Sequence, residues 1–308
     1  MRLSEIAWEK GDCAVVAVGN FDGLHPGHAA ILSRLIQESK AQNALSVVIT
    51  FSPHPVEYFR GIAMDRLTTL PDRVAGIRSS GVDRVFVLDF DEALANTSAE
   101  AFVAELIAKF SMRALILGPN GALGKGKEGT PVVLEKILRD RGVDLIVTAP
   151  EKIEGHWISS SRIRESLREG DVEGVVRLLG RPYEIVGRIA PGHAIARGMG
   201  TPTLNLSNIE TLLPMDGVYA TRTFVQGAWR GSVTNIGIRP TFHDTSERVV
   251  ETHVLDQSLQ GEILEARVRF LFRLRDEKKF KDAKALALAI AQDIEQARRY
   301  LGQHPSRD

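Results

Sequence analysis

The sequence has little that would place the protein outside the ordinary globular class. Cysteine occurs once, at Cys13, so an intramolecular disulfide is impossible, which fits a reducing cytoplasm. Acidic and basic residues number 39 each, and a net charge of +0 gives no reason to expect a nucleic-acid or membrane partner. No run of about 20 apolar residues is present, so we expect no membrane span. Met1–Lys10 carries charges and no long apolar core, so we expect no signal peptide.

The length and the apolar content predict two domains. The chain has 308 residues, and single hydrophobic cores seldom grow beyond about 250–300 residues. Hydrophobic residues make up 44% of the chain, which supplies apolar material for two cores. A change of pattern after about Gly180 places the first domain at residues 1–180 and the second at residues 181–303.

In the first domain, short apolar runs alternate with segments of helical periodicity. Apolar runs that end in glycine or polar residues are typical of buried parallel strands. Their alternation with helices predicts an α/β fold with a parallel sheet and helices on both faces. We expect strands at Cys13–Val18, Leu45–Thr50, Val82–Leu88, Ala114–Leu117 and Val143–Thr148, and helices at Pro26–Lys40, Ser98–Lys109 and Val132–Arg141.

In the second domain, several strand-like segments rich in Val, Thr, Tyr and Phe follow one another with turn residues between them. This density of short strands predicts a small antiparallel β-barrel. Phe280–Leu301 carries one apolar stripe at helical spacing, which predicts a terminal helix packed against the barrel. The expected strands are Tyr183–Arg188, Val218–Val225, Gly231–Ile236, Glu251–Leu255 and Ile263–Arg273.

The segment Gly19–His28 lies where the first predicted strand meets the first predicted helix. Open α/β sheets bind ligands at such junctions, and the N–H groups of a helix N-terminus favour anions. His25 and His28 are three residues apart, so their side chains can share a face and donate hydrogen bonds to a triphosphate. The alternative is that one histidine caps the helix while the other packs. The spacing within a glycine pattern favours the phosphate site.

The whole string, Gly-Asn-Phe-Asp-Gly-Leu-His-Pro-Gly-His, resembles the HxGH nucleotidylyltransferases. Within them it is similar to the FMN adenylyltransferase module of bacterial bifunctional riboflavin kinase/FAD synthetases. The resemblance implies a Rossmann-like nucleotidylyltransferase domain with His25 and His28 as catalytic residues. It also implies that Gly19, Phe21 and Asp22 bind ATP.

The segment Thr50–Pro55, after the second predicted strand, matches the same family. Two prolines with restricted φ can shape a rigid wall for a flat ring, although an ordinary loop is the alternative for the prolines alone. The resemblance implies that Pro53, Pro55 and Phe59 contact the flavin.

The segment Ile158–Arg164 resembles the family's Ser-Ser-Thr-x-x-Arg string, with Ser161 in place of the threonine. Hydroxyl groups at a helix start can cap the helix and bind phosphate. A plain cap explains one serine but not the whole string with its arginine. The resemblance implies that Ser160, Ser161 and Arg164 bind ATP.

The segment Gly118–Gly126 departs from the family pattern. Asn120 is retained, and the resemblance implies that it binds ATP. The family continues with Phe-x-Phe-Gly, whereas this chain carries Gly121 and Leu123 in place of both aromatics. An aromatic stack is worth on the order of 0.5–1.5 kcal/mol beyond burial, so its loss would weaken FMN binding by about tenfold.

The segment Gly198–Leu206 resembles the Gly-x-Pro-Thr-Ala-Asn signature of riboflavin kinases. Thr203 and Asn205 lie two residues apart, on one side of an extended segment. Their oxygens suit a Mg²⁺ ion that keeps phosphate and water ligands. The resemblance implies that Thr203 and Asn205 are metal ligands and that Gly200 and Thr203 bind ATP.

Two later strings complete the match. Glu251 lies where the family has its catalytic carboxylate, which would be the general base for the ribityl 5′-hydroxyl. For a single glutamate a solvated strand residue is the alternative, and the surrounding string favours catalysis. Leu274–Phe280 also matches, and the resemblance implies that Arg275 contacts the flavin.

Together the resemblances imply an enzyme with two reactions. The barrel would phosphorylate riboflavin with ATP and Mg²⁺ to give FMN, and the α/β domain would transfer AMP from ATP to FMN to give FAD and pyrophosphate. The implied partners are the small molecules riboflavin, FMN and ATP, in the cytoplasm. Two alternatives stay open: a riboflavin kinase whose first domain is impaired or only binds flavin, and a flavin-sensing regulator. The sequence does not indicate the oligomeric state, FMN channelling or a preference for oxidised or reduced flavin.

Overall fold

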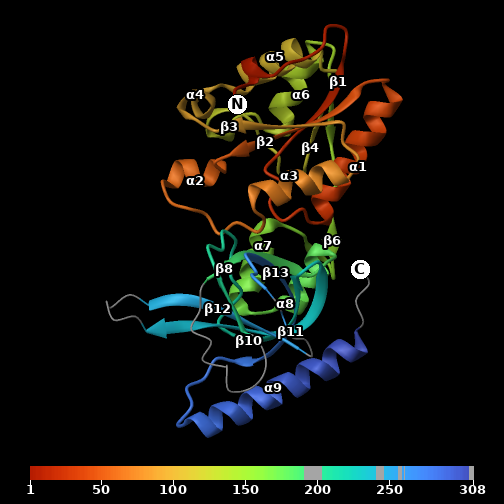
Figure 1. The fold of residues 1–308 in the computed structure, drawn as a ribbon. Helices are drawn as coiled ribbons and strands as arrows, with labels where there is room; N and C mark the ends of the chain where they lie inside the picture. The colour runs from red at the N-terminus through yellow and green to blue at the C-terminus, as the bar shows by residue number, and fades with distance from the viewer. Residues whose placement is uncertain (191–202, 241–245, 256–258, 260, 305–308) are drawn as a thin grey trace. The chain divides into compact units, whose positions relative to one another are not determined.

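The computed structural model describes residues 1–190, 203–240, 246–255, 259 and 261–304 (Figure 1). The chain forms two compact units, Met1–Ser160 and Ser161–Asp308. The helices α7 (Ser160–Glu169) and α8 (Val172–Leu179) therefore belong to the second unit, apart from Ser160. The sequence pattern changes only after these helices, so the predicted boundary at residue 180 lies later in the chain.

The first unit is built on five parallel strands in the order β3-β2-β1-β4-β5. The chain adds β2 and β3 on one side of the central β1, and then β4 and β5 on the other. The carboxyl end of β1 is therefore the topological switch point, where open α/β sheets bind ligands. The five strands confirm the predicted parallel sheet: β1 (Ala14–Val18), β2 (Leu45–Ser52), β3 (Arg84–Asp89), β4 (Ala114–Leu117) and β5 (Asp144–Val147).

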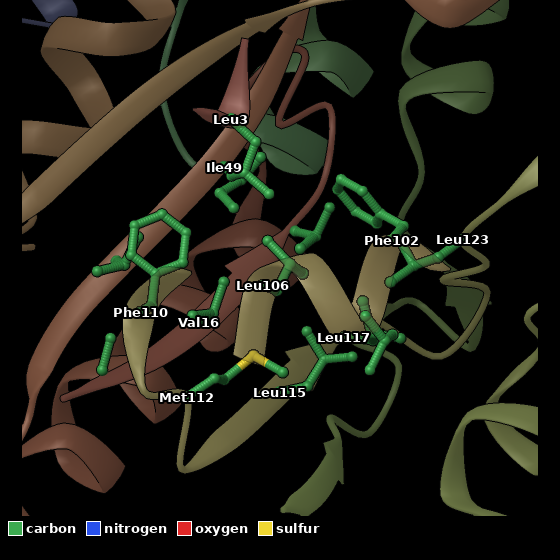
Figure 2. Packing of buried hydrophobic residues seen from close by; sticks show 14 of the residues in the cluster. Leu3, Val16, Ile49, Phe102, Leu106, Phe110, Met112, Leu115, Leu117 and Leu123 are labelled. Atoms are coloured by element: carbon green, nitrogen blue, oxygen red, sulfur yellow. The ribbon is translucent and has the colours of Figure 1, made fainter. Parts of the chain in front are cut away.

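Helices cover both faces of this sheet, as predicted, because successive residues of a buried strand point to opposite faces. Val15 packs with Leu35 and Ile77 on one face, whereas Val16 packs with Leu106 and Leu134 on the other. Figure 2 shows side chains of the second cluster, among them Phe102, Leu106 and Phe110 together with Val16 and Leu115 of the sheet. The covering helices are α1 (Pro26–Ala41) and α3 (Leu70–Ser79) on the first face, and α5 (Ala99–Phe110) and α6 (Pro131–Arg139) on the second.

Several short elements of the first unit were not predicted, because fewer than about seven residues carry no readable helical or strand period. They include the helix α2, which follows the proline-rich end of β2 and supports part of the site. The short elements are η1 (Leu3–Glu5), α2 (Pro55–Arg60), α4 (Glu92–Asn96), η2 (Lys125–Lys127), β6 (Lys152–Ile153) and β7 (His156–Trp157).

The second unit contains a closed antiparallel barrel in the order β10-β11-β12-β9-β8-β13, followed by a terminal helix (Figure 1). The predicted barrel and helix are confirmed, and β9 joins the barrel as a sixth strand. The elements are β8 (Tyr183–Ile189), β9 (Thr203–Ser207), β10 (Gly217–Val225), β11 (Ala228–Pro240), β12 (Ser246–Val254), β13 (Glu265–Asp276) and α9 (Ala283–Gln303).

Alternation along β10 and β11 separates the outside of the barrel from its interior. Val218, Ala220 and Val233 pack against Ala297 of α9, so this face is the outside. The hydroxyls of the alternate residues point inward and form a continuous hydrogen-bonded chain with O–O distances of 2.8 to 2.9 Å. This chain, called the hydroxyl ladder below, consists of Thr223, Ser232, Thr221, Thr234 and Thr252, all with no exposed surface.

Two candidate active sites

The loop after β1 is shaped by three residues with positive φ. Phe21, Gly23 and Leu24 have φ values of 53°, 87° and 45°. At Gly23 a Cβ atom would lie 2.8 Å from Leu67 Cδ1, so both the backbone conformation and the packing require glycine there. The chain then enters α1 at Pro26, the first helical position, where a missing N–H costs no hydrogen bond.

The two predicted catalytic histidines lie against each other. The rings of His25 and His28 stack with centroids 3.7 Å apart and planes 17° apart, which confirms that they share a face. His25 occupies the N-cap position of α1, but its side chain makes no capping hydrogen bond. The Nδ1 atoms of both rings are buried without a hydrogen-bond partner in the described structure. Neither histidine is therefore explained as a helix cap, and both keep a free ring nitrogen for a ligand.

Burial keeps both imidazoles neutral. Desolvation lowers the pKa of His25 from 6.5 to about 4, against the opposing effects of a backbone hydrogen bond and Asp22. Desolvation, followed by the charges of His25 and Arg73, holds the pKa of His28 well below its usual value. At neutral pH the pair can donate hydrogen bonds to phosphate oxygens as dipoles, and it carries no positive charge.

The neutral state of His25 predicts a pH dependence of stability. Its pKa in the folded protein, about 4, is below 6.5, so the unfolded chain binds the proton more readily between these values. The free energy of unfolding should therefore be highest above pH 6.5 and fall as the pH drops towards 4, on the order of 3 kcal/mol for this group. An NMR titration of the imidazole should show a midpoint near pH 4. A midpoint near 6.5, or an equal acid loss of stability in His25→Gln, would contradict this assignment.

Gly19 and Phe21 make contacts that stabilise the conformation of this loop. The N–H of Gly19 donates to the carbonyl of Ile49 at 3.0 Å. Phe21 is 1% exposed, and its ring packs over Gly19 and beside His28. These two residues thus lie at the site, and their direct contact with ATP stays a prediction.

Asp22 ties this loop to the segment before α3. Its carboxylate accepts the N–H groups of Leu67 and Thr68 at 3.0 to 3.1 Å and the Thr68 hydroxyl at 3.1 Å. The carbonyl of Asp22 accepts a hydrogen bond from Ser160 Oγ at 2.8 Å. Asp22 and Ser160 are therefore hydrogen-bonded to each other at the switch point of the sheet. Their contact with ATP stays a prediction.

The proline-rich end of β2 presents an aromatic edge. Pro53 is exposed and Pro55 is the first residue of α2. Phe59 is 65% exposed, and its ring contacts Tyr58 and Phe90 with centroids 5.4 and 5.8 Å apart. A flat apolar surface of this kind suits a flavin ring, as predicted for these residues, although no described contact tests it.

Sequence reasoning missed a buried ionic clamp under this edge. Glu57 is 6% exposed and accepts Arg66 Nε at 2.8 Å and Arg66 Nη2 at 3.0 Å. The N–H groups of His54 and Met64 also donate to it at 3.0 Å. Burial alone would raise the pKa of Glu57, but these hydrogen bonds lower it to about 2. The signal available in the sequence was a glutamate three residues after the N-cap residue His54, because this spacing marks a capping box.

The second candidate site is on the outer face of the barrel. Thr252 points inward to Thr234, so Glu251 and His253 point outward. The strand register sets Glu251 directly opposite Asn205 of β9 and Asn235 of β11. The predicted base and a predicted metal ligand are thereby neighbours on one surface.

The same register places Thr203 opposite His253. Thr203 and Asn205 therefore share the outer face with Glu251, as the extended segment predicts. Gly200, predicted to bind ATP, lies outside the described residues.

Comparisons with known proteins match both units. The FAD synthetase family model matches residues 8–162, and the riboflavin kinase family model matches residues 179–301. The bifunctional riboflavin kinase/FMN adenylyltransferase of Pseudomonas fluorescens is 33% identical over 288 residues, covering 92% of each chain. The protein of the same name from Escherichia coli (strain K12) is 32% identical, covering 94% of this chain and 93% of its own. The chain belongs to this bifunctional family.

A solved structure extends the comparison to three dimensions. A crystal structure described as a macrolide-efflux protein from Streptococcus pneumoniae has a TM-score of 0.87 and 27% identity, and the match covers 96% of this chain and 97% of that one. The efflux activity named in that description is a statement about the Streptococcus pneumoniae protein. In the part of this chain that the structure describes, no helix is long and apolar enough to cross a membrane.

The departure from the family at Gly118–Gly126 has a structural basis. Leu123 is 7% exposed and belongs to the core cluster on the α5 side of the sheet. At Gly121 a Cβ atom would lie 3.0 Å from the Gly118 carbonyl oxygen, so a larger residue requires the loop to shift. Asn120 stays exposed beside them. Leu123 thus serves the core, and Gly121 fits a loop that leaves little room for a larger side chain.

Three other predicted residues have defined positions. Ser161 and Arg164 lie on α7 in the second unit, and their contact with ATP stays a prediction. Arg275 forms a bidentate ion pair with the buried Asp293 of α9, with N–O distances of 2.8 to 3.1 Å. Arg275 thus fastens α9 to β13, and its flavin contact stays a prediction.

Replacing Arg275 with methionine should separate these two roles. Removing one partner of a mostly buried pair leaves Asp293 uncompensated, and we expect a loss of about 3 kcal/mol in the free energy of unfolding. Urea unfolding measures that loss, and the double variant Arg275→Met/Asp293→Leu should recover part of it. A higher KM for riboflavin with unchanged stability would instead support flavin contact.

Proposed function

We propose that this chain is a bifunctional enzyme that phosphorylates riboflavin to FMN and then adenylylates FMN to FAD. The observation that carries this proposal is one complete constellation in each unit: the stacked histidines at the switch point of the sheet, and Glu251 opposite Asn205 on the barrel. Membership of the bifunctional family supports both activities.

In the first unit, adenylyl transfer needs no protein nucleophile. A phosphate oxygen of FMN attacks the α-phosphorus of ATP, the bond from that phosphorus to the bridging oxygen breaks, and pyrophosphate leaves. Neutral His25 and His28 donate hydrogen bonds to oxygens on which charge builds during this exchange. Stacking and burial fix both rings before the substrate arrives, so little reorganisation is needed.

In the barrel unit, the 5′-hydroxyl of riboflavin must lose a proton as it attacks the γ-phosphorus of ATP. Glu251 accepts that proton as general base, and ADP leaves. Asn205 and Asn235 flank it on the neighbouring strands and orient polar groups at the same surface.

The outer-face residues also fit Mg²⁺. The hydroxyl of Thr203 and the amide oxygen of Asn205 are hard oxygen donors on one face of β9 and would hold the ion. When bound, Mg²⁺ supplies charge neutralisation to the phosphates of ATP. The single cysteine, which excludes an internal disulfide, supports a cytoplasmic location for this work.

One experiment tests the proposed function directly. The purified protein is incubated with riboflavin, ATP and Mg²⁺, and the flavins are separated by chromatography. We expect FMN to appear first and FAD to follow. FMN without FAD, even with FMN and ATP supplied in excess, would support the kinase-only alternative motivated by Gly121 and Leu123. No product at all would support a flavin-sensing regulator.

A further inference from the structure

Arg73 is a buried cation that no sequence motif singled out. It lies on α3 and is 6% exposed. Its Nη2 donates to the carbonyl of Phe51 at 2.9 Å, at the end of β2. Its Nε is buried without a hydrogen-bond partner, and among the described residues it forms no ion pair.

A buried guanidinium in this state is unusual, because a charge removed from water needs a counter-charge. Arg66, nearby in the same segment, has one: Glu57 accepts two of its N–H groups. Burial lowers the pKa of Arg73, and the charges of Asp22 and Glu57 oppose this effect without cancelling it. The Asp22 carboxylate also accepts the N–H groups of Leu67 and Thr68. Arg73 therefore keeps an unused donor at Nε and a positive charge that the neighbouring carboxylates offset only in part.

Arg73 lies at the same edge of the sheet as the stacked histidines, because Phe51 is at the carboxyl end of β2 and the histidines follow the carboxyl end of the neighbouring β1. Arg73 lines a small cavity at the carboxyl ends of β1 and β2, together with Ser52, Thr68, the ion-paired Arg66 and the carboxylates of Asp22 and Glu57. Its charge is one of the groups that lower the pKa of His28, after burial and His25. The guanidinium thus lies within electrostatic reach of the imidazoles at the switch point.

The chemistry of this site needs such a charge. The two substrates of adenylyl transfer, FMN and ATP, are both anions that repel each other, and neutral imidazoles offer hydrogen bonds but no positive charge. A fixed cation in a low-dielectric position attracts anions more strongly than one in water. The partly uncompensated charge of Arg73 is therefore suited to a substrate phosphate.

We propose that Arg73 is a positioning residue of the adenylyl-transfer site, whose buried charge holds a substrate phosphate at the stacked imidazoles. The phosphate comes from either FMN or ATP. The proposal rests on the proposed function, because adenylyl transfer is the reaction that it serves.

Three variants test this role in the full-length protein. Arg73→Met removes the charge and keeps the aliphatic stem, Arg73→Lys keeps the charge, and Arg78→Met is the control on the exposed side of the same helix. In FAD synthesis from FMN and ATP, we expect Arg73→Met to raise one KM at least tenfold, Arg73→Lys to recover most of it, and Arg78→Met to stay within twofold. A change in the KM for FMN identifies the flavin phosphate, and a change in the KM for ATP identifies the triphosphate.

Two readouts separate positioning from a structural role. FMN formation from riboflavin in the same variants should stay unchanged, since it occurs in the other unit. Unchanged KM values in Arg73→Met, or an equal loss of thermal stability in Arg73→Met and Arg73→Lys without a KM change, would overturn the proposal and leave Arg73 as a support for Phe51.

A measurement on the unmodified protein is independent of variant folding and of turnover. The Nε–H resonance of Arg73, assigned from its loss in Arg73→Lys, should shift when inorganic pyrophosphate is added. FMN is added in a parallel titration, and no shift at saturation with either pyrophosphate or FMN would overturn the proposal. If the unmodified protein makes no FAD but the resonance shifts, the proposed function fails while the phosphate site stands.

Discussion

Replacing Glu251 with glutamine is expected to lower FMN formation by about 10²–10⁴-fold, because a positioned general base contributes this much to the rate. Glutamine keeps the size and polarity of the side chain and cannot accept the hydroxyl proton. The outward position of Glu251 means that the barrel interior is untouched. Chromatography of the flavins after incubation with riboflavin and ATP measures the loss.

The same Glu251→Gln protein should convert added FMN to FAD at an unchanged rate, because that step occurs in the first unit. Glu265→Gln, at an exposed position of β13, is the matched control and should affect neither step. An equal fall of both activities in Glu251→Gln would mean that the division of labour between the units is wrong.

Replacing His28 with alanine should lower FAD formation by about 10²–10³-fold and spare FMN formation. The variant removes a preorganised hydrogen-bond donor from the place where charge develops, and it also removes the ring on which His25 stacks. Because the two rings touch, the double variant with His25→Ala should lose less than the product of the single losses.

His156→Ala is the control for this prediction, since His156 is an exposed histidine of β7 in the same unit. Rates of pyrophosphate release with FMN and ATP in excess provide the measurement. Retention of more than a third of the FAD-forming rate in His28→Ala would contradict a catalytic role for the pair.

The regular elements were predictable because their periods are long and their ends are marked. Cys13–Val18 is an unbroken apolar run and Leu45–Thr50 is rich in β-branched residues, and both lie within or overlap neighbouring parallel strands of the sheet. The apolar stripe of the terminal helix likewise identified α9, although the helix begins at Ala283 and not at Phe280. By contrast, β9 has five residues, and only pairing with β12 and β8 makes it a strand.

Roles that depend on distant partners were not predictable. Asp22 binds backbone N–H groups at Leu67 and Thr68, and a sequence pattern near Asp22 carries no trace of that pairing. Arg73 and Glu57 are charged residues on helices, which ordinarily indicate a solvated face, yet both are buried. Burial of a charge depends on what packs around it, so the structure was needed to single them out.

The hydroxyl ladder inside the barrel has a consequence for the chemistry on its outside. Thr252 of the ladder lies between Glu251 and His253, so a slip of β12 by one residue would turn the carboxylate inward and the hydroxyl outward. That misaligned barrel would bury a charge and leave Thr234 without its neighbour, both at substantial cost. A register shift that would misplace the general base therefore strongly destabilises the barrel. A correctly folded barrel presents Glu251 on its outer face.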